Sequence, residues 1–252
     1  MSIATLKFGP DAPTPLDLEG AALFLDLDGT LAPIAERPQD VGPDPRRTSL
    51  LERLSGCLDG RLAVISGRGL EDIDRILEGC VRPVAAVHGL VRRCADGRLH
   101  ETPPHPGLRL ARAAFHALAT ADPRLLVEDK GRSVTLHYRQ APDAEALAHQ
   151  AAQRLALETG LWRQDGAMVV ELRTPGPSKG DSVRAFLSEA PFAGARPVFV
   201  GDDLTDEDGF AAVHDLGGFG VMVGPIRPTR AQFRLRNVDH ALAWLEAALC
   251  PA

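Results

Sequence analysis

The sequence predicts an α/β fold in which a parallel-sheet domain is interrupted by an inserted α/β module. Three observations support this prediction. Short continuous apolar runs alternate with amphipathic helical patterns in the first and last thirds of the chain, antiparallel patterns fill the middle, and proline-rich segments separate the two. The 252 residues suffice for one large domain or two small ones.

The first part of the parallel-sheet domain follows a strand–helix–strand–helix–strand order. Continuous apolar runs indicate strands that are buried on both faces, and apolar stripes indicate helices. The expected strands are 21–25, 62–65 and 84–87, and the expected helices are 46–56 and 69–78. Such an order predicts a parallel sheet. Residues 1–20, with three prolines and little periodicity, are interpreted as a loose arm.

The middle of the chain shows a different pattern. Asp96-Gly97 is a hairpin signal between residues 91–93 and 98–100, and prolines at 103, 104 and 106 are typical of a linker. The elements expected next are a helix at 107–119, antiparallel strands at 125–128 and 133–138, a helix at 143–159 and a strand at 168–172. We therefore predict an inserted domain at 105–177, within a main domain formed by 1–104 and 178–252.

After the inserted domain, the alternation of predicted apolar strands and amphipathic helices resumes. The expected elements are a helix at 181–187, a strand at 197–200, a helix at 204–213, a strand at 219–223 and a terminal helix at 239–249. Ligands of open α/β sheets bind beyond the carboxyl ends of the strands, and the polar clusters of this sequence follow predicted strands. This coincidence predicts a ligand site at that edge of the sheet.

Composition narrows the possible partners. The net charge of −6 argues against nucleic acid or an anionic membrane as the main partner, so an anionic substrate would need a local cluster of cations. The four cysteines, Cys57, Cys80, Cys94 and Cys250, form no C-x-x-C pair, which argues against zinc and fits reduced thiols. Residues 1–18 lack a signal-peptide pattern, and no apolar run is long enough to span a bilayer, so we expect a cytoplasmic protein.

Two aspartates directly follow the first predicted strand. Asp26 and Asp28 lie two residues apart, so their carboxylates point the same way in an extended chain. A divalent cation such as Mg²⁺ would neutralise them, and Asp202 and Asp203 supply carboxylates at another strand end. One carboxylate can also attack phosphorus while a second transfers a proton. An isolated D-x-D is more often a surface turn, but its position after a buried strand favours phosphoryl chemistry.

Three further side chains at strand or helix ends suit a phosphate group. Thr30 can donate a hydrogen bond, and Ser66 combines a hydroxyl with the free N–H groups of a helix start. Lys179 opens a predicted helix and supplies a point charge. The simpler alternatives are a helix-capping Ser66 and a solvated surface Lys179.

The acidic run after the 197–200 strand continues beyond Asp203. Acids at a helix start are favoured by the helix dipole alone, and this explanation suffices for Glu207 and Asp208. For Asp206, helix capping and support of a metal site remain equal alternatives.

Four motifs, in this order, resemble those of the haloacid dehalogenase-like phosphatase superfamily. They are DLDGT at 26–30, VISGR at 64–68, Lys179 within SKG, and GDD at 201–203. The resemblance covers most of residues 20–90 and 175–250. It implies a Rossmann-like parallel-sheet core with an inserted α/β cap and a nucleophilic Asp26. An aspartate at position 28 favours phosphatase over dehalogenase chemistry.

Further segments resemble the trehalose-6-phosphate phosphatases, and this similarity spans nearly the whole chain. They are VHG at 87–89, VEDKG at 127–131, LHYR at 136–139, VELR at 170–173 and GDDLTDEDGF at 201–210. The resemblance implies that the cap binds the sugar hydroxyls through Glu128, Lys130 and Glu171. Charged donors and acceptors are suited to a polyol, because they form strong hydrogen bonds with its hydroxyls. A surface ion pair between Glu128 and Lys130 is the alternative.

Two other candidates for substrate binding are Arg139 and His88. Alternatively, Arg139 and Arg173 orient the acidic residues of the cap and do not contact the sugar. For His88, the alternative to substrate binding is a structural hydrogen bond at the domain junction.

The resemblance implies hydrolysis of trehalose 6-phosphate to trehalose and phosphate through an aspartyl-phosphate. The expected metal ligands are Asp26, Asp28 through its carbonyl, and Asp202, with Asp203 and Asp206 in supporting positions. The expected phosphate-binding residues are Thr30, Ser66, Gly67 and Lys179. Asp28 would protonate the departing sugar oxygen and then activate water. The expected cofactor is Mg²⁺, and the expected partner is the sugar phosphate alone, bound by a monomer.

Two other functions stay open. One is a phosphatase of another sugar phosphate, such as sucrose phosphate, or of a small phosphoglycolate-like acid; the charged groups on a large inserted module argue against a small substrate. The other is a non-catalytic sugar-phosphate sensor or a partner subunit of a trehalose synthase. The presence of Asp26, Asp28 and Lys179 argues against a protein that only binds.

Overall fold

The computed structural model describes residues 12–249, which fall into two compact units. One unit, here called the core, comprises the described residues within Met1–Leu99 and Ser178–Ala252. The other, the cap, comprises His100–Pro177. The first boundary predicted from the sequence, after residue 104, lies a few residues beyond this division. Each unit is described separately.

The core is built on an eight-stranded sheet with the order β12-β11-β10-β1-β2-β3-β4-β5. Its strands are β1 Ala21–Leu25, β2 Leu62–Ile65, β3 Val84–Ala86, β4 Val91–Arg93, β5 Leu99–Glu101, β10 Arg196–Gly201, β11 Phe219–Val223 and β12 Phe233–Leu235. The paired strands from β12 through β3 run parallel, and β4 pairs antiparallel with β3. The predicted parallel α/β fold is therefore confirmed.

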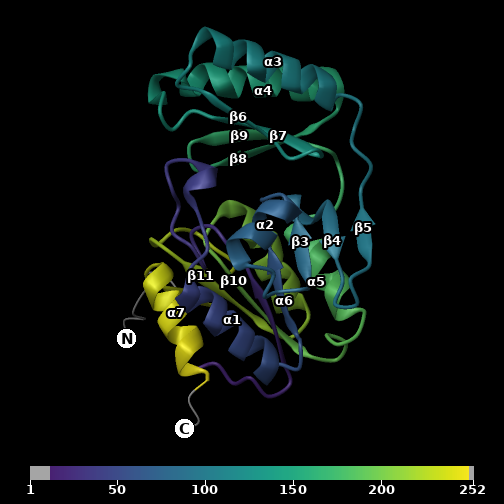
Figure 1. Cartoon of the computed structure of the whole chain (residues 1–252), viewed down its shortest axis with the longest axis vertical. Helices are drawn as coiled ribbons and strands as arrows, with labels where there is room; N and C mark the ends of the chain where they lie inside the picture. The colour runs from purple at the N-terminus through teal and green to yellow at the C-terminus, as the bar shows by residue number, and fades with distance from the viewer. Residues whose placement is uncertain (1–11, 250–252) are drawn as a thin grey trace, which may run out of the picture. The chain divides into compact units, whose positions relative to one another are not determined.

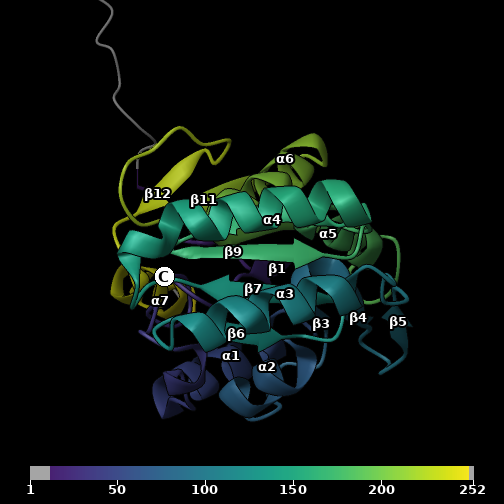
Figure 2. The same cartoon turned by 90° about the horizontal axis from the view of Figure 1, so that it is seen from above.

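Helices cover both faces of the core sheet, which explains its uninterrupted apolar strands. Along β1, Leu23 and Leu25 pack with α1 Pro45–Cys57, α2 Leu70–Leu77 and α7 Val238–Ala247. Phe24 points the other way, toward α5 Lys179–Leu187 and α6 Glu207–Asp215. Figures 1 and 2 show these two groups of helices on opposite sides of the sheet.

The cap contains a four-stranded antiparallel sheet with the order β6-β7-β9-β8. Its elements are α3 Leu108–Ala121, β6 Leu126–Asp129, β7 Ser133–His137, α4 Glu145–Thr159, β8 Trp162–Gly166 and β9 Val169–Arg173, with the 3-10 turn η3 Pro142–Ala144. Both helices cover one face of this sheet (Figure 1), where Phe115 and Leu155 pack on Val134 and Leu172. Because side chains alternate along a strand, the other face receives the polar residues.

A row of cross-strand neighbours defines that second face, here called the polar face. Glu128 lies opposite Thr135, Thr135 opposite Glu171, and Glu171 opposite Gln164. The neighbouring rows place His137 and Ser133 of β7 on the same face, two residues from Thr135 in either direction.

Two strands were not predicted from the sequence. The residues of β8, WRQDG, contain no apolar alternation, and β12 is only three residues long; both are edge strands. The helix predicted at 204–213 is instead a 3-10 turn, η4 Leu204–Asp206, followed by α6. Two further 3-10 turns in the core are η1 Pro38–Asp40 and η2 Val87–Gly89.

The predicted loose arm at 1–20 is partly fixed. The indole N–H of Trp244 donates a hydrogen bond to the carbonyl of Thr14 at 2.8 Å, and Leu16 is buried. The first eleven residues of that arm, and Cys250, lie outside the described residues. Within residues 12–249, no helix is both long and apolar enough to cross a membrane.

Candidate active site

Three adjacent strands of the core sheet are each followed by a predicted site residue. Asp26 directly follows β1, Ser66 follows β2 and Asp202 follows β10, and β1 lies between the other two strands. Since these strands are parallel, their carboxyl ends share one edge of the sheet. Residues separated by long stretches of sequence are thereby brought together.

A buried ammonium group joins two of the acids. Nζ of Lys179 donates hydrogen bonds to Oδ1 of Asp26 at 2.9 Å and to Oδ1 of Asp206 at 2.6 Å. Lys179 is the first residue of α5, whose start is capped by Ser178 and Asp181. Burial alone would lower the pKa of Lys179, but Asp206 and Asp26 raise it above its ordinary value, so the ammonium remains charged.

Asp206 also holds the backbone that carries Asp202. Its Oδ2 accepts hydrogen bonds from the N–H groups of Asp202 at 2.9 Å and Asp203 at 3.0 Å, and its side chain is completely buried. Asp203 in turn caps η4 by accepting a hydrogen bond from the N–H of Leu204 at 2.6 Å. Asp206 therefore has the capping role that was one of the two alternatives considered for it, and its support of a metal site stays a prediction.

The donor set fits a divalent cation. Asp26, Asp202 and Asp206 each offer a carboxylate oxygen, and the three atoms lie within 4.8 Å of one another. When all three carboxylates are ionised, the single ammonium of Lys179 leaves two of their negative charges uncompensated. Oδ1 of Asp202 is buried and has no hydrogen-bond partner among the described residues. A divalent metal ion would satisfy this oxygen and compensate both charges.

The pKa values of the acids reflect their burial first and the neighbouring negative charges second. Burial, reinforced by Asp206, raises the pKa of Asp202 to about 7. Burial also raises the pKa of Asp26 well above its ordinary value; Lys179 opposes this shift, while Asp206 and Asp202 add to it. Both carboxyls therefore bind a proton more readily than an exposed aspartate, and a cation has to displace that proton.

Gly29 is required by the close approach of Asp202. Its φ of +77° lies in the left-handed region, and a Cβ atom here would lie 2.0 Å from Oδ2 of Asp202. The glycine of the DLDGT motif thus lets the turn after β1 pass against the acid that follows β10.

The predicted phosphate-binding residues also lie in the core. Thr30 is completely buried, and its hydroxyl has no hydrogen-bond partner within the described part of the chain. The hydroxyl of Ser66 is buried and accepts a hydrogen bond from the N–H of Arg68 at 3.3 Å. The Thr30 hydroxyl is therefore an unsatisfied buried polar group, a feature that is rare away from functional sites.

His88 belongs to this part of the core rather than to the cap. Its backbone N–H donates to the carbonyl of Ser66 at 2.9 Å, and its own φ is +56°. A Cβ atom on Gly67 would lie 2.5 Å from the His88 ring, so the two residues pack directly together. This arrangement accounts for the glycine after Ser66.

Asp28 is engaged by a residue to which no role was assigned from the sequence. Arg68 donates from Nε to Oδ2 of Asp28 at 2.7 Å and from Nη2 to Oδ1 at 2.8 Å. Arg68 is itself buried and also binds Asp72 and the carbonyl of Pro38. Its position in VISGR, two residues after Ser66 at a strand end, was the available signal. The bidentate pair holds both carboxylate oxygens of Asp28 in this conformation.

In the cap, the three predicted sugar-binding residues lie together on the polar face. Lys130 Nζ is 3.3 Å from Oε1 of Glu171 and 3.8 Å from Oε2 of Glu128. Ser133 donates from its hydroxyl to Glu171, and His137 Nε2 lies 2.9 Å from Oε2 of Glu128. The ion pair between Glu128 and Lys130, considered from the sequence, is thus part of a larger, mostly buried network.

Arg139 follows β7 and donates from Nη2 to the carbonyl of Ala167 at 3.0 Å. His137 and Ser133 were not singled out from the sequence. The predicted antiparallel pairing around Lys130-Gly131 was a sufficient signal, because it places alternate residues of the second strand on the face that carries Glu128.

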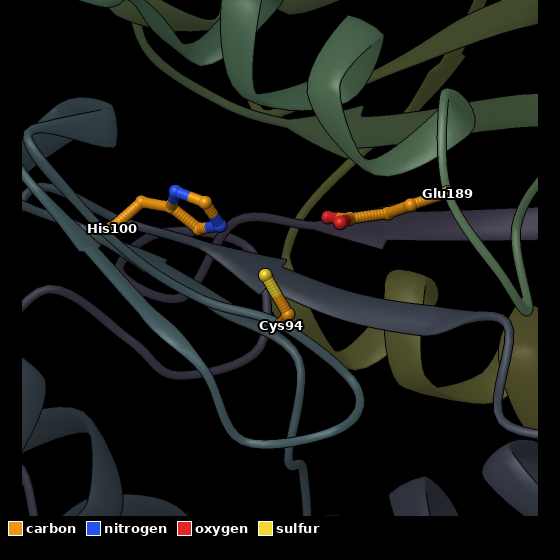
Figure 3. A group of neighbouring side chains, drawn as sticks. All are labelled: Cys94, His100 and Glu189. Atoms are coloured by element: carbon orange, nitrogen blue, oxygen red, sulfur yellow. The ribbon is translucent and has the colours of Figure 1, made fainter.

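A second group of potential ligand side chains is less suited to a cation. Figure 3 shows Cys94 and Glu189 with His100, a residue of strand β5 of the eight-stranded sheet. Glu189 is already paired with Arg92, and Nη2 of Arg98 lies 3.7 Å from it. Burial raises the pKa of the Cys94 thiol. The core members of this group therefore carry no excess negative charge.

The fold and the site define a class. A parallel α/β sheet that gathers a buried aspartate, a serine, a lysine and an acidic loop at one edge, with an inserted cap, is the arrangement of a haloacid dehalogenase-like phosphatase. A family model described as trehalose-phosphatase matches residues 24–239. The chain belongs to the trehalose-phosphatase family.

Individual proteins of known name are also similar to this chain. The chain is 41% identical over 229 residues to a probable trehalose-phosphate phosphatase of Sinorhizobium fredii, covering 90% of this chain and 86% of that one. It is 41% identical over 230 residues to the trehalose-6-phosphate phosphatase of Escherichia coli, covering 89% and 85%. The solved C-terminal domain of the C. albicans trehalose-6-phosphate phosphatase matches with a TM-score of 0.84 at 23% identity, covering 97% and 99%, and shows the fold.

Proposed function

We propose that this protein is a Mg²⁺-dependent phosphatase that hydrolyses trehalose 6-phosphate to trehalose and inorganic phosphate. The observation that carries the proposal is the buried Asp26, hydrogen-bonded to Lys179 at 2.9 Å and grouped with Asp202 at one sheet edge. The substrate is inferred from relatives of that name and from the charged polar face of the cap.

Asp26 serves as the nucleophile in this proposal. A carboxylate oxygen of Asp26 attacks phosphorus while the bond from phosphorus to the sugar O6 breaks, which forms an aspartyl-phosphate. The ammonium of Lys179 and the hydroxyls of Thr30 and Ser66 stabilise the phosphoryl oxygens. Most of the rate enhancement then comes from positioning and charge compensation.

Mg²⁺ would be held by Asp26, the backbone carbonyl of Asp28 and Asp202, and when bound it supplies positive charge that offsets the phosphate and the acids. The identity of the ion rests on the all-oxygen donor set, which suits a hard cation.

Asp28 transfers protons in both half-reactions. It donates a proton to the departing O6, and it then removes one from the water that attacks the aspartyl-phosphate, regenerating Asp26. The two hydrogen bonds from Arg68 occupy one lone pair on each oxygen of Asp28 and leave a second lone pair on each for proton transfer. In this proposal Arg68 therefore orients Asp28.

The polar face of the cap binds the sugar hydroxyls. Glu128 and Glu171 supply ionised acceptors, and Lys130 between them supplies a donor. Such groups favour a substrate whose hydroxyls match them over one that lacks those hydroxyls.

The test is phosphate release from a panel containing trehalose 6-phosphate, sucrose 6-phosphate, glucose 6-phosphate and p-nitrophenyl phosphate, with Mg²⁺ and with EDTA. We expect the highest kcat/KM for trehalose 6-phosphate and no turnover in EDTA. Asp26→Asn should fold normally and lose turnover. Activity of Asp26→Asn within about tenfold of wild type, roughly 1.4 kcal/mol in barrier, would exclude Asp26 as the nucleophile.

The panel also tests the other two functions. A higher kcat/KM for sucrose 6-phosphate would identify a different sugar phosphatase. Tight binding without phosphate release would identify a sensor. A C. albicans trehalose synthase regulatory protein domain shares the fold with a TM-score of 0.69 at 14% identity. The grouping of Asp26, Asp202 and Lys179, rather than the fold, favours catalysis over binding alone.

A further inference from the structure

We propose that His137 is a positioning residue for sugar recognition, which fixes the carboxylate of Glu128 so that one of its oxygens is presented to a substrate hydroxyl. The inference rests on the proposed function, because it takes the polar face of the cap as the sugar-binding surface.

Strand register brings the two side chains together. In the antiparallel pair of β6 and β7, Leu126 lies opposite His137 and Glu128 lies opposite Thr135. His137 is therefore the diagonal neighbour of Glu128 on the polar face, a separation that long side chains can bridge. Nε2 of His137 lies 2.9 Å from Oε2 of Glu128, and only 16% of the His137 side chain is exposed.

Both partners of Glu128 in the described cap approach the same oxygen. His137 contacts Oε2 at 2.9 Å, and Lys130 contacts Oε2 at 3.8 Å. Oε1 takes part in neither of these contacts, and we assign to it the hydrogen bond from the substrate hydroxyl. The Lys130 contact is too long for a hydrogen bond, so the direction of the carboxylate depends on His137.

The charge of Glu128 is set by the same contacts. Burial alone would raise its pKa, but the hydrogen bond from His137 and the charge of Lys130 lower it below its ordinary value, against the repulsion from Glu171. An ionised carboxylate accepts stronger hydrogen bonds than a neutral one. His137 thus helps to keep Glu128 ionised as well as oriented.

The two cap acids are held in matching ways. Glu171 is bonded by Ser133 at one end of β7, and Glu128 is bonded by His137 at the other end, with Lys130 between the two acids. Strand β7 therefore contributes one positioning hydrogen bond to each acid. Without His137, Glu128 would keep only the longer contact to Lys130.

The test compares two substitutions of His137 that should raise KM to different extents. His137→Leu removes the donor, whereas His137→Gln places an amide N–H close to the position of Nε2. For His137→Leu we expect KM for trehalose 6-phosphate to rise roughly tenfold, with kcat nearly unchanged, because about one charged hydrogen bond is lost. For His137→Gln we expect a rise below about threefold, and for both variants unchanged kinetics with p-nitrophenyl phosphate.

A matched control exists in the same unit. His149 is also partly buried and is bonded to Tyr138 through Nε2 at 3.1 Å, but it lies on helix α4. His149→Leu should leave KM for trehalose 6-phosphate unchanged. Thermal unfolding of each variant verifies that the cap is folded.

A double-substitution cycle tests whether His137 acts through Glu128. In a Glu128→Gln background, His137→Leu should raise KM no further. Multiplicative losses, or equal losses in the leucine and glutamine variants, would overturn the inference, as would an equal loss on p-nitrophenyl phosphate. Failure of the proposed function is recognised separately, because wild-type enzyme would then hydrolyse trehalose 6-phosphate no better than p-nitrophenyl phosphate.

Discussion

Replacing Lys179 by methionine should destabilise the core in a manner that depends on pH. The ammonium of Lys179 lies 2.9 Å from Asp26 and 2.6 Å from Asp206, and all three side chains are buried. Removal of one partner from a buried ion pair costs about 3–5 kcal/mol, because the remaining charges are left without compensation. Methionine matches the length of the side chain, so the loss reports charge rather than volume.

The sign of the pH dependence follows from the acids. Burial already raises the pKa values of Asp26 and Asp202 in the folded state, the latter to about 7, and loss of the ammonium raises them further. A carboxyl whose folded pKa exceeds its unfolded pKa binds more protons when folded, so stability decreases as pH rises. Lys179→Met should therefore be much less stable at pH 8 than at pH 5.

Urea unfolding in EDTA, followed by circular dichroism, measures this difference. Arg184→Met provides a control on the same helix, because the pair of Arg184 with Asp215 at 2.8 Å is exposed and should contribute less than about 1 kcal/mol. A loss below about 1 kcal/mol for Lys179→Met at pH 8, or equal losses at both pH values, would refute the charge-compensation argument.

Three further predictions concern the metal site and the cap. The apparent affinity for Mg²⁺ should rise between pH 6 and pH 8, by up to about tenfold per pH unit below the Asp202 pKa of about 7, because the ion displaces a proton; calorimetry showing a flat profile would contradict this. Gly29→Ala should reduce Mg²⁺ affinity and turnover at least tenfold, roughly 1.4 kcal/mol, since its Cβ would lie 2.0 Å from Asp202; unchanged calorimetry and kinetics would exclude the steric argument. Leu172→Ala, in the fully buried cap core, should cost about 2–5 kcal/mol in urea unfolding, whereas a loss near zero would show that the cap repacks.

Much of the core site could be predicted from the sequence because its residues directly follow strands that are easily recognised. Asp26, Ser66 and Asp202 each come immediately after a continuous apolar run, and parallel strands place such positions at one edge. The edge strands β8 and β12 were missed because one is polar and the other is only three residues long. A strand covered on one side only, or barely paired, has no continuous apolar run to signal it.

The sequence by itself determined the α/β class, the inserted module and the residue types of the chemistry, since these depend on local periodicity and on what immediately follows a strand. The tertiary structure decided which of these residues are partners. Arg68 and Asp28 are 40 residues apart, and Lys179 and Asp26 are 153 apart. Such pairs depend on strand order, and the bond from His137 to Glu128 depends on register. Strand order is not encoded in the local pattern of apolar and polar residues, and the hairpin pattern fixes only the face on which His137 and Glu128 lie, not the contact between them.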